Sequence, residues 1–107
     1  MAWIWILIAS CFEISWAVSL KYSQGFTQLK ASIFTIITMI LSYVFLSLGV
    51  NELPIGTAYA VWTGIGAVGT ALYGILYFNE PKDLLRIIFI FIIIVGIIGL
   101  RLTYKST

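Results

Sequence analysis

The chain has 107 residues but no histidine, a single cysteine, two prolines and only 9% charged residues. A soluble domain of this length carries far more charge, so the composition argues against a water-soluble fold. The lone Cys11 cannot form an intrachain disulfide, and without histidine the usual ligand set of a zinc site is missing. Since no nucleophile–base pair stands out either, we expect no enzymatic activity, metal, cofactor or nucleic-acid partner.

Apolar residues, by contrast, make up 62% of the chain and gather into four long segments. The segments cover residues 2–20, 31–50, 55–78 and 84–102. Each is close to the roughly 20 residues that a membrane-spanning helix needs, and polar stripes at helical spacing are almost absent. The sequence therefore predicts an all-α, multi-pass membrane protein whose residues 1–107 form one domain of four transmembrane helices.

Glu13 is the only charged residue in the first apolar segment. An ionised carboxylate that lacks a partner inside a membrane span costs several kcal/mol, so such residues are rarely without a function. The position of Glu13 predicts a function in which this one group takes up and releases a proton or a cation.

Four other side chains carry hydrogen-bond donors at positions compatible with a site around Glu13. Trp16 lies three residues after Glu13 and shares its helical face. Tyr59 and Trp62 have the same spacing in the third segment, and Ser42 lies within the second. Together they predict a polar site lined by aromatic rings. The alternative is that the aromatic residues anchor at the membrane interface and the serine bonds its own backbone.

Small residues form two ridges along the third apolar segment. One consists of Gly56, Ala60, Gly64, Ala67 and Ala71, and the other of Gly66, Thr70 and Gly74. Small residues let helices approach closely, so this helix is expected to pack on two sides. Gly64 and Gly66 also weaken its middle, which predicts a bend that would serve a transporter as a hinge. Tight packing without a hinge is the alternative.

In the fourth segment, Gly96 and Gly99 lie on roughly one face of a helix that has no polar side chain between Ile87 and Leu100. Because small residues promote helix association in lipid, the two glycines are candidates for a dimer contact. A helix that faces lipid and carries incidental glycines is an equally good interpretation. Four helices alone leave little room for a pocket, and a dimer would bring two copies of Glu13 together.

Basic residues give only a small orientation bias. If the two chain ends share one side of the membrane, four basic residues lie on the other side and two lie with the ends; these are Lys21, Lys30, Lys82 and Arg86 against Arg101 and Lys105. Under the positive-inside rule such a bias is compatible with insertion in both orientations, a single orientation being the alternative.

Three sequence features identify a family. They are Phe12–Glu13 followed by Trp16, the stretch KYSQGFT at residues 21–27, and LPIGTAYAVWTG at residues 53–64. On these the chain resembles the small multidrug resistance transporters over essentially its whole length. Within that family, Trp16 beside Glu13 and the motif at residues 56–60 resemble the guanidinium-exporter branch.

The resemblance implies a homodimer of two oppositely oriented subunits in the bacterial inner (plasma) membrane, surrounded by lipid. It implies antiport of protons against guanidinium and related small cations by alternating access. Proton and substrate would share Glu13. The residues expected around this carboxylate are Trp16, Ser42, Tyr59 and Trp62.

Several alternatives remain open. A guanidinium cation matches a carboxylate through its N–H groups, whereas a quaternary ammonium relies on cation–π contacts, and aromatic residues suit both. The chain could thus be a broader quaternary-ammonium or multidrug exporter, or one half of a heterodimer with a paralogous subunit. A channel, or a membrane assembly subunit without transport activity, is a further possibility.

Overall fold

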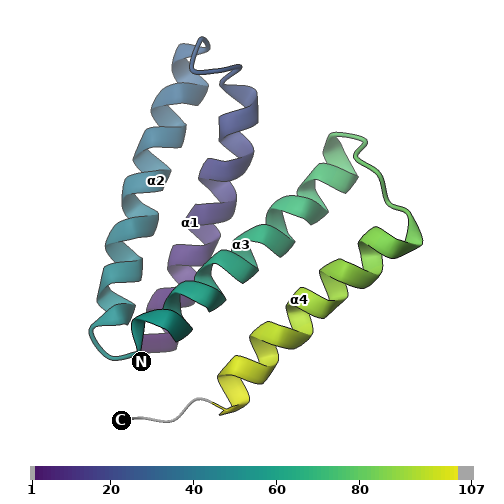
Figure 1. Ribbon diagram of the computed structural model, residues 1–107. Helices are drawn as coiled ribbons and strands as arrows, with labels where there is room; N and C mark the ends of the chain where they lie inside the picture. The colour runs from purple at the N-terminus through teal and green to yellow at the C-terminus, as the bar shows by residue number, and fades with distance from the viewer. Residues whose placement is uncertain (1, 104–107) are drawn as a thin grey trace.

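The computed structural model describes residues 2–103, which fold into four α-helices joined by short loops (Figure 1). The helices are α1 (Ala2–Tyr22), α2 (Leu29–Val50), α3 (Ile55–Tyr77) and α4 (Leu84–Thr103). All four are long and apolar enough to cross a membrane, which confirms the predicted all-α fold with four spans. Each helix begins and ends within two residues of its predicted span.

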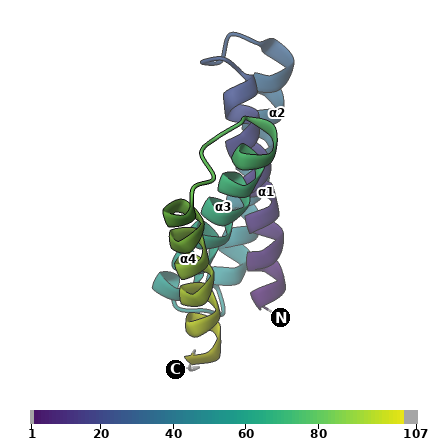
Figure 2. The same cartoon turned by 90° about the vertical axis from the view of Figure 1, so that its right-hand side faces the viewer.

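The helices form a thin slab. α1 and α2 run antiparallel beside each other, α3 crosses them at an angle, and α4 lies along α3 (Figure 1). The start of α1 and the end of α4 lie at the same end of the molecule (Figure 2). The principal extents are 45 × 35 × 16 Å, so the subunit is only about two helices thick. A slab of this thickness has two broad faces and little interior.

The contact between α1 and α2 is built from small hydroxyl residues. On α2 the buried residues are Ser32, Thr35, Thr38, Ser42 and Gly49. The hydroxyls of Ser19 on α1 and Thr35 on α2 lie 2.6 Å apart and join the two helices directly. Thr38 instead donates to the backbone carbonyl of Phe34 at 2.7 Å. Because the membrane offers no water to polar groups, internal bonds of this kind make a close hairpin possible.

The first half of α3 packs into the apolar core of the subunit. Its residues Ala58, Val61 and Trp62 are at most 2% exposed and lie against Ala2, Ile6 and Ala9 of α1. Further along, α3 leans away from the α1–α2 hairpin (Figure 1). There a hydrogen bond of 3.0 Å between the Tyr22 and Tyr73 hydroxyls connects α1 to α3. The start of α3 is therefore fixed more firmly than its end.

The loop between α3 and α4 has a specific backbone geometry. Asn79 has φ +54°, a left-handed conformation that asparagine tolerates better than most residues. The carbonyl of Gly74 accepts hydrogen bonds from the backbone N–H groups of Phe78 and Glu80. Glu80 then forms an ion pair of 2.9 Å with Arg86 in the first turn of α4. These contacts hold the start of α4 close to the end of α3.

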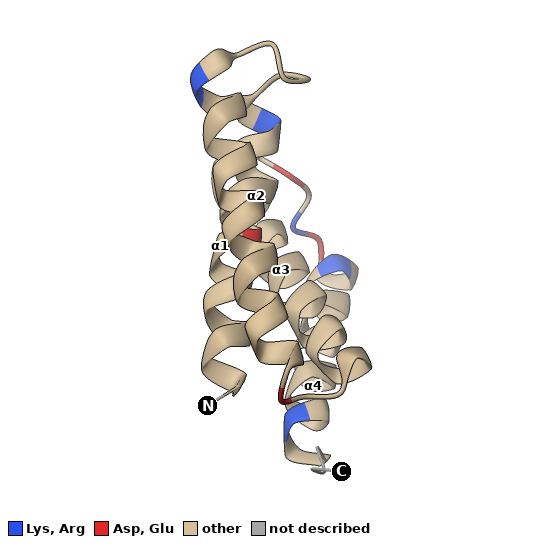
Figure 3. Cartoon of the chain, turned by 90° about the vertical axis from the view of Figure 1, so that its left-hand side faces the viewer, with Lys and Arg blue, Asp and Glu red and all other residues tan. Residues whose placement is uncertain are grey.

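The basic residues that the structure describes lie near the ends of the helices (Figure 3). Lys105, one of the two predicted to lie on the side of the chain ends, falls outside the described residues. The acidic position inside the body of α1 is Glu13 (Figure 3). The membrane-spanning part thus has charged residues at its edges and one carboxyl group at mid-depth.

The predicted hinge and dimer contacts remain predictions. α3 is one continuous helix through Gly64 and Gly66. Gly96 and Gly99 lie on α4, and a Cβ atom built at either position would meet no other atom within 4 Å. Both glycines therefore face open space on the subunit, as either a dimer contact or a lipid-facing helix requires.

The close approach of α1 and α2 gives a testable prediction. A Cβ atom at Gly49 would overlap the buried side chain of Ile6, whereas one at Gly56 would meet nothing within 4 Å. Gly49→Ala should lower the free energy of unfolding by about 1–3 kcal/mol because a packed contact must open. Gly56→Ala is the matched control, and it should be neutral or stabilising by roughly 0.5–1 kcal/mol.

The measurement is reversible denaturant unfolding of both variants in detergent micelles, followed by helical circular dichroism. Equal stability of the two variants would show that α1 and α2 do not approach as closely as described.

Candidate functional site

Glu13 reaches from α1 to the middle of α3, where Gly66 makes room for it. A Cβ atom at Gly66 would overlap the carboxyl group of Glu13, so any side chain larger than hydrogen would displace that group. Gly66 itself is buried. Glycine is thus required here for the close approach of helix backbone and carboxyl group, and not for an unusual φ angle.

The carboxyl group opens into a cavity of about 270 Å³ between α1 and α3. Its lining residues are Glu13, Trp16 and Ala17 from α1, and Thr63, Gly66, Ala67 and Thr70 from α3. On α1, Trp16 and Ala17 follow Glu13 by three and four positions. On α3, Gly66 and Ala67 follow Thr63 by the same spacings, and Thr70 follows Gly66 by four. Each set therefore forms one helical face. The small residues of the α3 face, together with Ala17 of α1, leave the space next to Glu13.

Three polar atoms on the residues that line this cavity are buried and have no hydrogen-bond partner among the residues that the structure describes. They are Oε1 of Glu13, Nε1 of Trp16 and Oγ1 of Thr70. Buried polar atoms in native proteins are nearly always hydrogen-bonded, so unpaired ones need an explanation. Their meeting in one cavity indicates a place where a polar or charged ligand binds.

Ser42 and Trp62, which the sequence also placed near Glu13, are paired with each other. Trp62 Nε1 donates to Ser42 Oγ at 2.9 Å, and Ser42 Oγ donates to the carbonyl of Ala9 at 2.7 Å. Ala9 is four residues before Glu13 and therefore one turn away on the same face of α1. In an α-helix the carbonyl of Ala9 also accepts the backbone N–H of Glu13, so the pair is anchored beside the backbone of Glu13 and supports α1 there.

Tyr59 packs against the Ser42–Trp62 pair and reaches the surface of the subunit. Its ring lies 5.5 Å from the ring of Trp62, centroid to centroid, and 54% of the residue is exposed. Tyr43 of α2 approaches Trp62 from another side, with the ring centroids 5.3 Å apart. Exposed aromatic faces next to a carboxylate site can receive an organic cation by cation–π contact.

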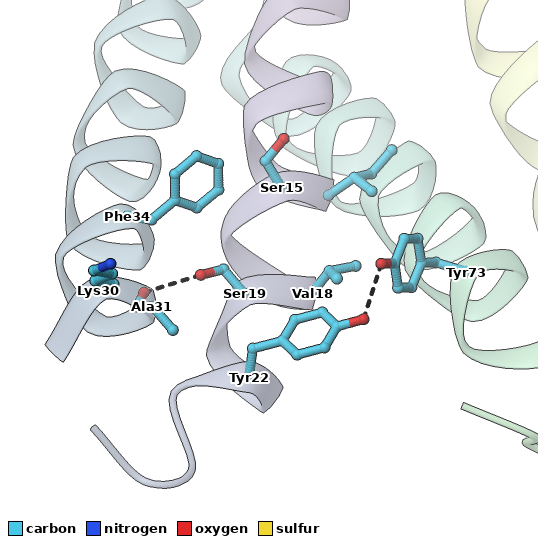
Figure 4. Close-up of a pocket in the computed structure, with 9 residues that line it drawn as sticks. Ser15, Val18, Ser19, Tyr22, Lys30, Ala31, Phe34 and Tyr73 are labelled. Atoms are coloured by element: carbon cyan, nitrogen blue, oxygen red, sulfur yellow. Dashed lines mark hydrogen bonds between the residues drawn. The ribbon is translucent and has the colours of Figure 1, made fainter. Parts of the chain in front are cut away.

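A larger cavity of about 520 Å³ lies elsewhere and has a lysine instead of a carboxylate on its wall (Figure 4). It opens between α1, α2 and Tyr73, and Ser15 and Tyr22 on its wall are roughly 180–200° around α1 from Glu13. Tyr22 and Tyr73 bond each other across it (Figure 4). Lys30 contributes a positive charge, and no carboxylate lines the cavity. Size alone therefore does not identify the site.

The sequence singled out Glu13 and Trp16 but did not identify Thr70 as a site residue. Thr70 appeared there only as one of the small residues of a packing ridge. Its ridge partner Gly66 contacts the Glu13 carboxyl group, and Thr70 follows one turn later. The spacing from Gly66 was visible in the sequence, but which helix the ridge faces is a matter of tertiary packing.

The chain is similar in sequence to known transport proteins. The family model for the Small Multidrug Resistance protein matches residues 1–93. A relative from Proteus vulgaris named guanidinium exporter is 53% identical over 102 residues, which cover 95% of this chain and 98% of the relative. Relatives of the same name from Citrobacter freundii and Yersinia pseudotuberculosis are each 52% identical over 96% and 95% of this chain, and over 98% of their own length.

The contact between Gly66 and Glu13 can be tested directly. Gly66→Ala should abolish or strongly weaken cation-induced proton release from the purified protein, because the added methyl group forces the carboxyl group out of its place. Gly56→Ala is the matched control, because its Cβ would meet no atom within 4 Å. Proton release is recorded in weakly buffered detergent solution with a pH indicator while guanidinium chloride is added. Normal release from Gly66→Ala would place the carboxyl group elsewhere.

Proposed function

Because the chain belongs to the small multidrug resistance family, we propose that it exports guanidinium and related small cations in exchange for protons. It is a multi-pass protein of the bacterial inner membrane, with four helices that can span it. The relatives named guanidinium exporter match it over nearly their whole length, which supports guanidinium as the substrate class.

The observation that carries the proposal is the carboxyl group of Glu13 beside two other unpartnered polar atoms in one cavity. A carboxylate buried in the membrane is stable only when it is neutralised by a proton or by a bound cation. Guanidinium is planar and offers parallel N–H donors that fit the two oxygens of one carboxylate. The same group can therefore hold either a proton or a guanidinium ion, but not both.

This exclusive occupancy is the basis of the proposed exchange. A proton arriving at Glu13 removes the negative charge that holds the substrate, so the cation leaves. A cation arriving at the ionised carboxylate keeps the proton away in turn. The site would open alternately to the two sides of the membrane. If it switches sides only when Glu13 is neutralised by a proton or a cation, protons entering the cell drive cations out. Ser42 and Trp62 would support the site through their bond to the Ala9 carbonyl beside the Glu13 backbone, and Tyr59 packs against Trp62.

The middle of α3 is the proposed hinge of that change. Gly64 contacts α4, since a Cβ there would lie 2.9 Å from the Cδ1 atom of Ile97, and Gly66 contacts Glu13. The two glycines are separated by a single residue, so a bend between them would move the end of α3 relative to the site. Glycine lowers the resistance of a helix to such bending.

We further propose that two subunits of opposite orientation form the working unit. A slab 16 Å thick cannot enclose a cation on all sides, and the Glu13 cavity is walled only by α1 and α3. A second copy would close it and bring a second Glu13 nearby. A heterodimer with a paralogous subunit would meet the same geometric need.

A second candidate function is export of quaternary ammonium compounds. The exposed ring of Tyr59 and the neighbouring Tyr43 favour it, because such cations bind through their contact with aromatic faces. Uptake of guanidinium and of tetrapropylammonium into the same proteoliposomes, measured side by side, distinguishes the two functions.

The central prediction concerns Glu13→Gln. Glutamine has nearly the same shape but cannot titrate, so the variant should fold and dimerise while proton-coupled guanidinium exchange in proteoliposomes falls to the background of protein-free liposomes. Wild-type protein in the same lipid and at the same density is the reference. Substantial coupled exchange by the variant would remove Glu13 from the mechanism.

A further prediction concerns the proposed dimer face of α4. Gly96→Leu and Gly99→Leu add side chains into space that is open within the subunit, so the subunit fold should stay intact. If this face meets a second copy, both variants should shift the monomer–dimer equilibrium toward monomer by about tenfold or more.

Ile87→Leu, at an exposed position on the other side of α4, is the control and should change little. The measurement is energy transfer between labelled subunits as the protein is diluted in lipid vesicles. Unchanged association in both glycine variants would assign this face of α4 to lipid.

A further inference from the structure

We propose that Thr70 determines the specificity of the site by accepting a hydrogen bond from the substrate N–H groups that Glu13 does not engage. The inference rests on the proposed function and adds to the site a residue that the sequence did not predict for it. The observation behind it is the unpaired hydroxyl oxygen of Thr70, a residue that lines the Glu13 cavity.

The unpaired state of this hydroxyl is unusual for a membrane-spanning helix. Serine and threonine in such helices normally donate to the backbone carbonyl four residues earlier. Ser10, Thr38 and Thr63 do so, at distances of 2.7, 2.7 and 2.8 Å. Thr70 forms no hydrogen bond within residues 2–103, although its Oγ1 atom is buried. Its donor and its acceptor capacity are therefore both unused within the described residues.

Thr70 is also in the right place relative to the carboxyl group. Gly66 contacts Glu13, and Thr70 lies one turn further along the same face of α3, about 6 Å along the axis. A small planar cation bound to the Glu13 carboxylate in this cavity would have Thr70 within reach of another edge. The walls nearby are the small residues Ala17 and Ala67.

The hydrogen-bond capacity of the lining residues makes Thr70 the suitable acceptor. A guanidinium ion has N–H donors on all three nitrogens, and one carboxylate satisfies only those on one edge. Trp16 cannot accept the remaining bonds, because an indole N–H only donates. Thr63 also lines the cavity, but its hydroxyl is held against the carbonyls of Tyr59 and Ala60 at 2.8 and 3.3 Å.

The same hydroxyl suits the state without substrate. A threonine O–H that accepts from a guanidinium N–H can rotate and donate to a carboxylate when the cation has left. A buried polar group that is left unpaired costs free energy. A hydroxyl that has a partner both with the cation bound and after it has left avoids this penalty. A cation without N–H groups gains nothing from Thr70, and this is the origin of the selectivity.

Two substitutions separate the hydroxyl from the shape of Thr70. Thr70→Val keeps the branched shape and removes the hydroxyl, whereas Thr70→Ser keeps the hydroxyl and removes the methyl group. Guanidinium affinity is measured with the full-length purified dimer, by tryptophan fluorescence during titration with guanidinium chloride at fixed pH. Size-exclusion chromatography confirms that every variant is a folded dimer.

Thr70→Val should weaken guanidinium binding about tenfold, as expected for one hydrogen bond to a charged group, while Thr70→Ser stays within about threefold of wild type. Thr38→Val is the matched control. It removes a buried hydroxyl that is bonded to its own helix and lies outside the cavity, so affinity should not change.

The opposite order, with Thr70→Ser weakened and Thr70→Val normal, would show that Thr70 acts only by packing and would overturn the inference. Equal affinities in all variants would overturn it as well. In both cases wild-type protein still binds guanidinium, so the proposed function stands. Wild-type protein that shows no guanidinium binding would instead refute the proposed function, and the role of Thr70 with it.

Discussion

The structure depends on the contact between the carboxyl group of Glu13 and the backbone of α3 at Gly66. A carboxyl group at mid-depth in the membrane needs space without water and polar neighbours within reach. Gly66 gives the space, because no other residue leaves room beside the backbone there. The small residues Ala17 and Ala67 widen it into a cavity. The ridge of small residues on α3 is thus explained by the carboxyl group as much as by helix packing.

The polar groups of the membrane-spanning region fall into two classes. Between α1 and α2, hydroxyls such as those of Ser19 and Thr35 bond each other or nearby carbonyls, and they hold the hairpin closed. Between α1 and α3, Glu13 and Thr70 each retain a buried atom without a partner among the described residues. A satisfied network makes a rigid support, whereas an unsatisfied one is costly unless a ligand completes it. The hairpin is therefore the scaffold, and the α1–α3 contact is where we propose that the ligand binds.

The sequence predicted the fold well because the lengths of apolar runs between charged and turn residues are set by the membrane thickness, and they can be counted. It also identified Glu13, since a lone charge in such a run is conspicuous. Thr70 could not be found in this way. A threonine in an apolar helix has the same appearance whether it bonds its own backbone or faces a cavity, and only the packing of α1 against α3 distinguishes the two.

The pairing of Ser42 with Trp62 shows the same limit. The sequence suggested that both residues would surround Glu13, and it could not say that they bond each other and the carbonyl of Ala9. Hydrogen bonds between side chains on different helices depend on the rotation of each helix about its axis. That rotation is determined by side-chain packing across the whole contact, and no single residue type encodes it.

The position of Gly64 beside Gly66 connects the site to the outer helix. At about 100° per residue, two residues separated by one position point to roughly opposite sides of a helix. Gly64 accordingly meets Ile97 of α4, while Gly66 meets Glu13 of α1. The middle of α3 is therefore held between the carboxyl group on one side and α4 on the other. Because a packed contact does not deform continuously, any movement of α3 that makes room for a cation at Glu13 must also shift its packing against Ile97. Occupancy of the proposed site and the placement of α4 are thereby coupled through Gly64 and Gly66, two glycines separated by one residue on the same helix.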